Sequence, residues 1–227
     1  MIVKLEKVYL GYQDNNVIEN INLIIQKGDF IHLSGDNGSG KSTFLKLLYM
    51  KLLPKSGNFF FHNKKITKIS QQHISILRRK IGVILQNNFL IPYLSVSQNI
   101  DLVNQIHKLE ILDSQKRVKE IINWVGLKDI CNNKVDDLSE GEKKKVVIAR
   151  ALVGKPDILL ADEPTTYLDN ITKEKFYFLL NTLNNFGTTV ILSEKNDSIK
   201  IENNHRRFRI SNKKINEVWI ILKSQIY

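Results

Sequence analysis

The pattern of hydrophobic and polar residues predicts short strands along the chain. Residues 1–34 alternate apolar and polar positions and end in the run Phe30-Ile31-His32-Leu33-Ser34, which is typical of short strands followed by a fully buried one. Residues 57–66 favour an edge strand and a turn. Further short runs that are apolar throughout, or β-branched and apolar, lie at 81–85, 158–161 and 188–192.

Apolar spacing predicts helices between these strands. The stretch 43–53 is apolar and unbroken until Pro54, and residues 139–153 form another helical stretch. From 95 to 127 the periodicity is helical, and one helix face gathers Val118, Ile121, Ile122 and Val125. Because helices alternate with short buried strands, the pattern predicts an α/β fold with a mostly parallel sheet.

The helical stretch from about 90 to 138 interrupts this alternation. We interpret it as an inserted helical subdomain within a single domain that spans residues 1–227. Residues 1–89 and 139–227 then form the core of that domain. We see no internal repeat and no low-complexity linker.

Composition excludes several classes of protein. The 227 residues are 42% hydrophobic and 25% charged, with 11 Gly, 4 Pro and a single cysteine, Cys131. These values exclude a collagen-like, disordered or disulfide-rich chain. No run of 18 consecutive apolar residues occurs, and the first residues lack the long apolar core of a signal peptide. We therefore expect a cytoplasmic protein without a membrane span of its own.

The chain is basic, with 34 Lys and Arg against 23 Asp and Glu and a formal net charge of +11. Such a charge fits nucleic acid, an anionic membrane surface or anionic ligands, or a general bias towards Lys, Asn and Ile. The lysines are scattered, with clusters at 78–80, 143–145 and 206–209, and a charge run is usually a solvated face. The scattered positions of the lysines favour the general bias in composition as the source of the charge, and we expect no nucleic-acid partner.

A glycine-rich turn lies between the first buried strand and the first predicted helix. The run Gly35-Asp36-Asn37-Gly38-Ser39-Gly40-Lys41-Ser42, followed by Thr43, fits the P-loop pattern. Glycines let backbone N–H groups wrap round phosphate oxygens, and a helix N-terminus adds partial positive charge. Lys41 would bridge the β- and γ-phosphates, and the Ser42 hydroxyl would ligate Mg²⁺. The alternative is a glycine-rich turn with a surface lysine.

Two acids, Asp162 and Glu163, directly follow the apolar run 158–161. Ligands of open α/β sheets bind at the carboxyl ends of the strands, so a strand that ends beside the P-loop would deliver both carboxylates there. Asp162 would hold Mg²⁺, through water, and Glu163 would orient or deprotonate the attacking water. The alternative is a helix cap after a buried strand, with Pro164 at the turn.

The segment Leu138-Ser139-Glu140-Gly141-Glu142 opens another predicted helix. Ser139 and Glu142 have the spacing of a capping box. The Ser139 hydroxyl and the Gly141 N–H would also present a helix N-terminus to a phosphate. The two interpretations can both hold.

These features, in this order, resemble the family of ABC-type ATPase subunits, and the resemblance covers essentially the whole chain. It rests on the P-loop from Gly35 to Thr43, Gln86 after a strand, the segment 138–142, Asp162-Glu163-Pro164 and Leu168-Asp169. It implies a P-loop ABC cassette with a mostly parallel core sheet, an N-terminal antiparallel β part and an inserted helical subdomain. It also implies that ATP is sandwiched in a head-to-tail homodimer.

The resemblance assigns roles to particular residues. Ser139 and Gly141 would act on the ATP held by the partner subunit. Tyr12 would stack on adenine, the alternative being an ordinary strand aromatic. Gln86 would sense the γ-phosphate and Mg²⁺ and relay this to a membrane partner, and Asp169 would cross the dimer interface.

Within the family, two segments are similar to the cell-division FtsE group, whose ATPase works with the membrane protein FtsX. They are residues 77–86, which end in Gln86, and residues 160–165. Lipoprotein-releasing and macrolide-exporting ATPases share much of this pattern. The resemblance implies an FtsE-like ATPase at the inner face of the cell membrane, bound there through an integral FtsX-like permease.

The sequence departs from the family pattern in three places. Glu140 replaces a signature glycine, Lys195 stands where the family has a switch histidine, and the lysines 143–145 replace a glutamine-rich start of the signature helix. A lysine can contact the γ-phosphate as a point charge, but it cannot accept a hydrogen bond as a neutral histidine can. We expect an active but slow ATPase; the alternative is a weakly hydrolysing switch whose output is conformational.

The partner surface is expected in a groove near Gln86, lined by Phe89, Leu90, Ile91, Pro92 and Tyr93. The alternative is that these are core residues of the helical insert. The apolar tail 217–223 would pack on the core, or would contact the membrane or the partner. A soluble nucleic-acid-associated ABC protein is a third alternative, but such chains usually carry two cassettes and this chain has one P-loop.

Overall fold

The computed structural model describes residues 1–66, 69–166, 168–195 and 205–218. The apolar tail from residue 219 onward lies outside the described residues, so neither interpretation of it is tested.

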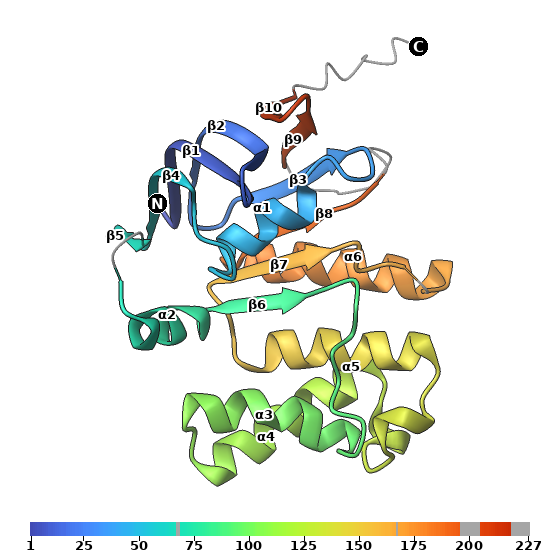
Figure 1. Cartoon of the computed structure of the whole chain (residues 1–227). Coiled ribbons are helices and arrows are strands. Elements are labelled where there is room, and N and C mark those ends of the chain that lie inside the picture. The colour runs from blue at the N-terminus through green and yellow to red at the C-terminus, as the bar shows by residue number, and fades with distance from the viewer. Residues whose placement is uncertain (67–68, 167, 196–204, 219–227) are drawn as a thin grey trace.

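Among the described residues, the strands form two sheets (Figure 1). The smaller sheet has the order β2-β1-β4-β5 and all its pairs are antiparallel. Its strands are β1 (Val3–Tyr12), β2 (Asn15–Ile25), β4 (Ser56–Phe61) and β5 (Lys64–Lys65). This confirms the N-terminal antiparallel part. The range 57–66 contains the predicted turn and edge strand, since β5 lies at the edge of this sheet, but it also holds most of β4, which lies between β1 and β5.

The larger sheet has the order β10-β9-β3-β8-β7-β6. Its strands are β3 (Phe30–Gly35), β6 (Ile81–Ile84), β7 (Ile158–Asp162), β8 (Thr189–Ser193), β9 (Arg206–Ser211) and β10 (Lys214–Glu217). Every pair is parallel except β9–β10. Every residue of β3, β7 and β8 is buried, as their unbroken apolar runs predict.

Four neighbouring parallel strands therefore end at the same edge of the larger sheet. The P-loop follows β3, Lys195 follows β8, Glu163 follows β7 and Gln86 follows β6. Sheet order, not chain order, makes these segments neighbours.

The helices pack around this sheet (Figure 1). They are α1 (Lys41–Leu48), α2 (Gln71–Arg78), α3 (Val96–His107), α4 (Ile111–Val125), α5 (Glu140–Val153) and α6 (Asn170–Asn185), with short 3₁₀ turns η2 (Lys128–Ile130) and η3 (Val135–Asp137). Helix α1 packs on β1, β3 and β7, and so joins the two sheets.

Helices α3 and α4 pack against α5 below the sheet in Figure 1. The apolar face predicted for 95–127 is confirmed: Val118 and Ile122 are buried, and Ile121 and Val125 pack against the same cluster. That cluster also contains Val146 and Ala149 of α5. The inserted helices thus share a core with α5, and the subdomain limits at about 90 and 138 stay a prediction.

Two helix boundaries differ from the prediction. Helix α1 ends at Leu48 rather than at 53, because Met50 takes a left-handed φ of 61°. The Arg78 guanidinium donates to the carbonyl oxygens of Tyr49 and Met50, at 3.2 and 2.8 Å, and so satisfies groups at this helix end. The stretch 95–127 holds two helices, because Lys108, with φ 58°, caps α3.

Candidate nucleotide-binding site

The turn between β3 and α1 has the backbone that a P-loop needs. Gly38 and Gly40 adopt left-handed φ values of 77° and 110°, which side-chain-bearing residues rarely tolerate. A Cβ atom at Gly40 would also lie 2.8 Å from Cγ1 of Val17. Gly40 is the N-cap of α1, so the loop opens directly onto a helix N-terminus.

Lys41 points its charge back into this loop. The side chain is buried, with 5% of its surface exposed. Its Nζ atom donates to the carbonyl oxygens of Gly35 and Asp36, at 2.6 and 3.1 Å. The ammonium is therefore held by the loop that would wrap a phosphate.

A cavity of about 430 Å³ joins the P-loop to the ends of the neighbouring strands. The sequence-predicted residues that line it are Asn37, Gly38, Gly40, Lys41, Ser42, Thr43, Gln86, Glu163 and Lys195. Val17 also lines it and was not anticipated, because a single valine on a strand carries no signal of a ligand. The other predicted residues of this region, Tyr12, Gly35, Ser39 and Asp162, do not line the cavity.

The residues of the cavity fit a phosphate and a divalent cation. The Ser39 hydroxyl does not line the cavity, but it is buried in the same turn and has no hydrogen-bond partner within the described part of the chain, so an unsatisfied polar group lies beside the phosphate site. The loop amides and Lys41 supply positive charge. Ser42 and Gln86 line the cavity and supply hydroxyl and amide oxygens. Asp162 does not line it but directly precedes the lining residue Glu163 and supplies a carboxylate, and oxygen ligands of these kinds are the ones that Mg²⁺ prefers.

Glu163 is held in an uncommon backbone conformation at the end of β7. Its φ is 45°, a left-handed value that costs energy for a residue with a side chain. Its N–H donates to the carbonyl oxygen of Ser193 at 2.9 Å, so strand β8 fixes the turn. Asp162, one residue earlier, is paired with Ser193 in the β7–β8 register and is buried.

Three residues singled out from the sequence meet at one carboxylate oxygen. The Gln86 side-chain amide donates to Oε2 of Glu163 at 3.2 Å, and the Lys195 ammonium lies 3.6 Å from the same atom. The Lys195 side chain is 55% exposed, so water screens this ion pair. Gln86, Glu163 and Lys195 thus form one contact group facing the P-loop.

A second acid, Glu194, stands beside this group and was missed as a site residue. Burial raises the pKa of Glu194, and the Glu163 carboxylate raises it further, although the Thr165 hydroxyl donates to it at 2.9 Å. Its position directly after a buried strand at the ligand-binding edge was the available signal.

Tyr12 lies at the end of β1, beside the helix that follows the P-loop. Lys46 of α1 donates to its hydroxyl at 3.1 Å. Burial raises the pKa of Tyr12, but hydrogen bonds with Thr43 and Lys46 outweigh it and lower the pKa below its usual value. The ring is exposed beside α1, and its role in stacking stays a prediction.

The capping box predicted at the start of α5 is present. Ser139 Oγ accepts from the Glu142 N–H, and the Glu142 carboxylate accepts from the Ser139 N–H at 2.9 Å. The extra charge of Glu140 is partly compensated, because Lys143 lies 3.1 Å from it and Asn88 donates to it at 3.3 Å. Ser139 and Gly141 do not line the P-loop cavity, as a role towards a second subunit requires.

Asp169 is the N-cap of α6. Its carboxylate accepts from the Thr172 N–H at 2.9 Å and from the Thr172 hydroxyl at 2.6 Å, and these bonds lower its pKa. Its role at a dimer interface is untested.

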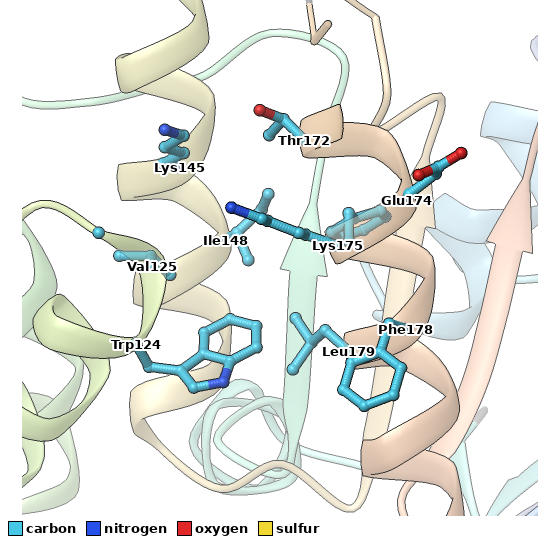
Figure 2. A pocket seen from close by; sticks show the side chains of 11 residues that line it. Trp124, Val125, Lys145, Ile148, Thr172, Glu174, Lys175, Phe178 and Leu179 are labelled. Carbon is cyan, nitrogen blue, oxygen red and sulfur yellow. The ribbon is translucent and has the colours of Figure 1, made fainter. Parts of the chain in front are cut away.

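A larger cavity, of about 600 Å³, lies apart from the P-loop between α4, α5 and α6 (Figure 2). Its apolar lining comes from Trp124, Ile148, Phe178 and Leu179. Two lysines also line it, Lys145 from α5 and Lys175 from α6. It shares no lining residue with the nucleotide cavity. Cavity size alone therefore does not identify the nucleotide site, because the P-loop residues and Glu163 line the smaller cavity.

A P-loop on a mostly parallel sheet, with two acids after a neighbouring strand and a glutamine after the next, defines a nucleotide-hydrolysing ATP-binding cassette. The family model described as "ABC transporter" matches residues 18–166, well over half of the chain. The chain belongs to the ABC transporter family. It is an FtsE-like ATP-binding and ATP-hydrolysing subunit.

Known proteins support this assignment along nearly the whole chain. The cell division ATP-binding protein FtsE of Bacillus subtilis is 35% identical over 199 residues, which is 87% of each chain. The solved dimeric ATP-binding cassette MJ0796, in a post-hydrolysis state bound to ADP and Pi, matches with a TM-score of 0.88 and 32% identity over 96% of this chain and 98% of that one. CbiO1 of Clostridium perfringens, part of the ABC transporter complex cbiONQ, matches with a TM-score of 0.83 and 30% identity. The match covers 95% of this chain and 86% of that one.

No helix in the described ranges is long and apolar enough to cross a membrane.

Proposed function

We propose that this chain hydrolyses ATP as the cytoplasmic subunit of an FtsE–FtsX-like membrane complex that acts in cell division. ATP would close two copies head to tail, and closure would be transmitted to the membrane subunit. The observation that carries the proposal is the single cavity in which Lys41, Gln86 and Glu163 meet. The names of the FtsE relatives support the division role.

The residues of the cavity have complementary tasks. Lys41 and the loop amides would bind the phosphates, and Glu163 would accept a proton from the attacking water. Mg²⁺, held by Ser42, Gln86 and Asp162, would neutralise charge on the phosphate oxygens. Ser139 and Gly141 of one subunit would complete the site of the other, because helix N-termini bind anions.

Exposed aromatic side chains follow Gln86 and suit a membrane partner. Phe89 and Tyr93 are 66% and 75% exposed. Leu90, in contrast, packs against two hydrophobic clusters, the one that contains Leu159 of β7 and the one that α5 shares with α3 and α4. The predicted groove lining is thus split between surface and core. Exposed apolar side chains beside the predicted γ-phosphate sensor support a docking surface there.

The first test is Glu163→Gln. Removing the base while keeping the shape of the side chain is expected to abolish steady-state turnover and to leave ATP binding intact, so that ATP traps a dimer. Dimer formation is followed by light scattering in the same samples. Unchanged turnover in Glu163→Gln would contradict the proposed base.

A second candidate function is a weakly hydrolysing, ATP-dependent switch. The Lys195 ammonium lies 3.6 Å from the Glu163 carboxylate. This contact favours the second candidate, because an ion pair occupies the carboxylate that would otherwise bind the attacking water. Absence of turnover in the unaltered protein, with ATP still binding, would favour the switch over the enzyme.

The membrane partner is tested by co-purification. The double variant Phe89→Ser/Tyr93→Ser should keep the turnover of the isolated chain and lose the integral membrane subunit that accompanies the unaltered chain from cell membranes. Identification of that subunit separates an FtsX-like partner from a lipoprotein-releasing or macrolide-exporting one. Retention of the partner by the double variant would remove this surface from the proposal.

A further inference from the structure

A buried lysine of α5 contacts the loop that carries Gln86. Lys144 is 1% exposed, although it is the middle residue of a lysine run that resembles a solvated face. Its ammonium donates to the carbonyl oxygens of Leu85 and Gln86, at 3.0 and 3.4 Å. The signature helix thus reaches the backbone at the point where β6 ends.

An arginine on the same helix holds the next part of this loop. Arg150 donates to the carbonyl oxygens of Asn88 and Phe89, at 2.9 and 2.8 Å. The Asn88 side chain in turn donates to Glu140, at the first turn of α5. Four carbonyls between residues 85 and 89 therefore accept from two cations of one helix.

The sheet gives this segment little support of its own. Strand β6 is at the end of the sheet order and pairs only with β7 among the described strands, up to Ile84. Carbonyl groups beyond Ile84 need partners from elsewhere when they are not exposed to water. Lys144 and Arg150 supply charged donors, which make stronger hydrogen bonds than neutral ones.

A buried ammonium is costly unless its surroundings favour its charge. Burial lowers the pKa of Lys144, and the carboxylates of Asp162, Glu140 and Glu194 oppose that shift. They come from β7, from the start of α5 and from the segment after β8. Lys144 therefore lies among the groups of the nucleotide site without lining its cavity.

We propose that Lys144 and Arg150 are positioning residues that fix the loop 85–89 to α5, so that Gln86 and the helix start at Ser139 and Gly141 move as one body. Contact of Gln86 with the nucleotide of its own subunit is then coupled to the presentation of Ser139 and Gly141 to the nucleotide of the partner subunit. The inference rests on the proposed role of Gln86 in hydrolysis.

Turnover tests the positioning role. Lys144→Met keeps an unbranched side chain of similar length but removes the donor, and is expected to lower kcat about tenfold because a displaced catalytic group loses much of its effect. The KM for ATP should change less than twofold, since Lys144 does not touch the P-loop. Lys144→Gln keeps a donor and should restore most of kcat.

Lys145→Met is the matched control. It makes the same substitution at the next residue of the same helix, but Lys145 lines the cavity between α4, α5 and α6 (Figure 2). Its kcat should equal that of the unaltered chain. Equal losses in both variants, or an unchanged kcat in Lys144→Met, would overturn the proposal.

A second measurement does not depend on hydrolysis. The N–H of Ile91, just after the loop, donates to Oδ1 of Asn99 at 2.8 Å and is therefore protected from exchange. Its hydrogen exchange, without added nucleotide, should be faster in Lys144→Met and in Arg150→Lys, and unchanged in Lys145→Met. Arg150→Lys keeps the charge but not the two-pronged contact, so it serves even if Lys144→Met does not fold. Unchanged exchange in the folded variants overturns the attachment.

The two proposals fail differently. If Gln86→Ala leaves turnover unchanged, the role of Gln86 in hydrolysis is wrong, while the exchange experiment still decides whether α5 holds the loop. If Gln86→Ala lowers turnover but Lys144→Met and Arg150→Lys do not, the positioning role alone is wrong.

Discussion

Glu163 combines a left-handed backbone with a carboxylate that both Gln86 and Lys195 approach. The conformation is maintained because the N–H of Glu163 bonds to β8. Strain of this kind points the side chain into the cavity rather than along the strand direction. The proposed general base is therefore positioned by the sheet, and Gln86 and Lys195 both contact its carboxylate.

The role of Lys195 is open to a direct test. If its ammonium contacts the γ-phosphate, Lys195→Ala should lower kcat about a hundredfold or more, as expected for loss of one donor at a developing charge. Steady-state turnover at saturating ATP measures kcat. Unchanged kcat would exclude the role, and increased kcat would mean that Lys195 restrains Glu163.

Tyr12 should contribute to nucleotide affinity through its ring rather than its hydroxyl. Tyr12→Ala is expected to weaken ATP binding about two- to thirteenfold, since aromatic stacking contributes about 0.5–1.5 kcal/mol. Tyr12→Phe loses the bond from Lys46 but keeps the ring, and should bind ATP normally. Equilibrium titration with ATP compares the two, and equal weakening in both would assign the effect to the hydroxyl.

Among the elements, those with a strong local signal were predictable. Strands β3, β7 and β8 are short apolar runs, and α5 begins at a capping box. Strand β9 was not predicted because three of its six residues are arginines, and its burial comes only from Phe208 and Ile210. The end of α1 depends on Arg78, 28 residues beyond Met50, which no local pattern reveals.

The site follows the same division. The P-loop and the acid pair are contiguous motifs, so the sequence predicts their chemistry. The attachment of α5 to the Gln86 loop joins residues 59 positions apart, from Leu85 to Lys144. A lysine within a lysine run gives no sign of burial, and only the packing of α5 under β6 decides which of the three faces inward.

The end of α1 offers a test of element stability. Arg78→Ala removes both donors to Tyr49 and Met50 and is expected to lower the free energy of unfolding by about 1–3 kcal/mol. Arg79→Ala, at an exposed neighbouring position, should change it by less than about 0.5 kcal/mol. Urea unfolding of both variants makes the comparison, and equal effects would exclude the capping role of Arg78.

At the scale of the whole molecule, the proposed head-to-tail dimer would make each site from two chains. Lys41→Ala should then disable the P-loop, and Gly141→Asp should place an anion where the partner's phosphate would lie. An acid in the first turn of α5 suits the helix dipole, so Gly141→Asp should fold.

Mixing these two inactive variants should restore turnover. Half of the dimers in an equal mixture contain one of each chain, and each of those has one intact site, so activity should recover to at most about a quarter of that of the unaltered protein. The measurement is ATP turnover against mixing ratio. No recovery at any ratio would contradict a shared site.

The position of the Lys41 ammonium also sets which anions the loop selects. A ligand that draws this charge away must replace hydrogen bonds of 2.6 and 3.1 Å to two carbonyl oxygens, so its own contacts must exceed theirs. A triphosphate chain offers the oxygens of three phosphoryl groups to the lysine and the loop amides together, whereas free orthophosphate offers the oxygens of only one. The released phosphate should therefore be a poor competitor for the loop, and hydrolysis should proceed with little inhibition by this product.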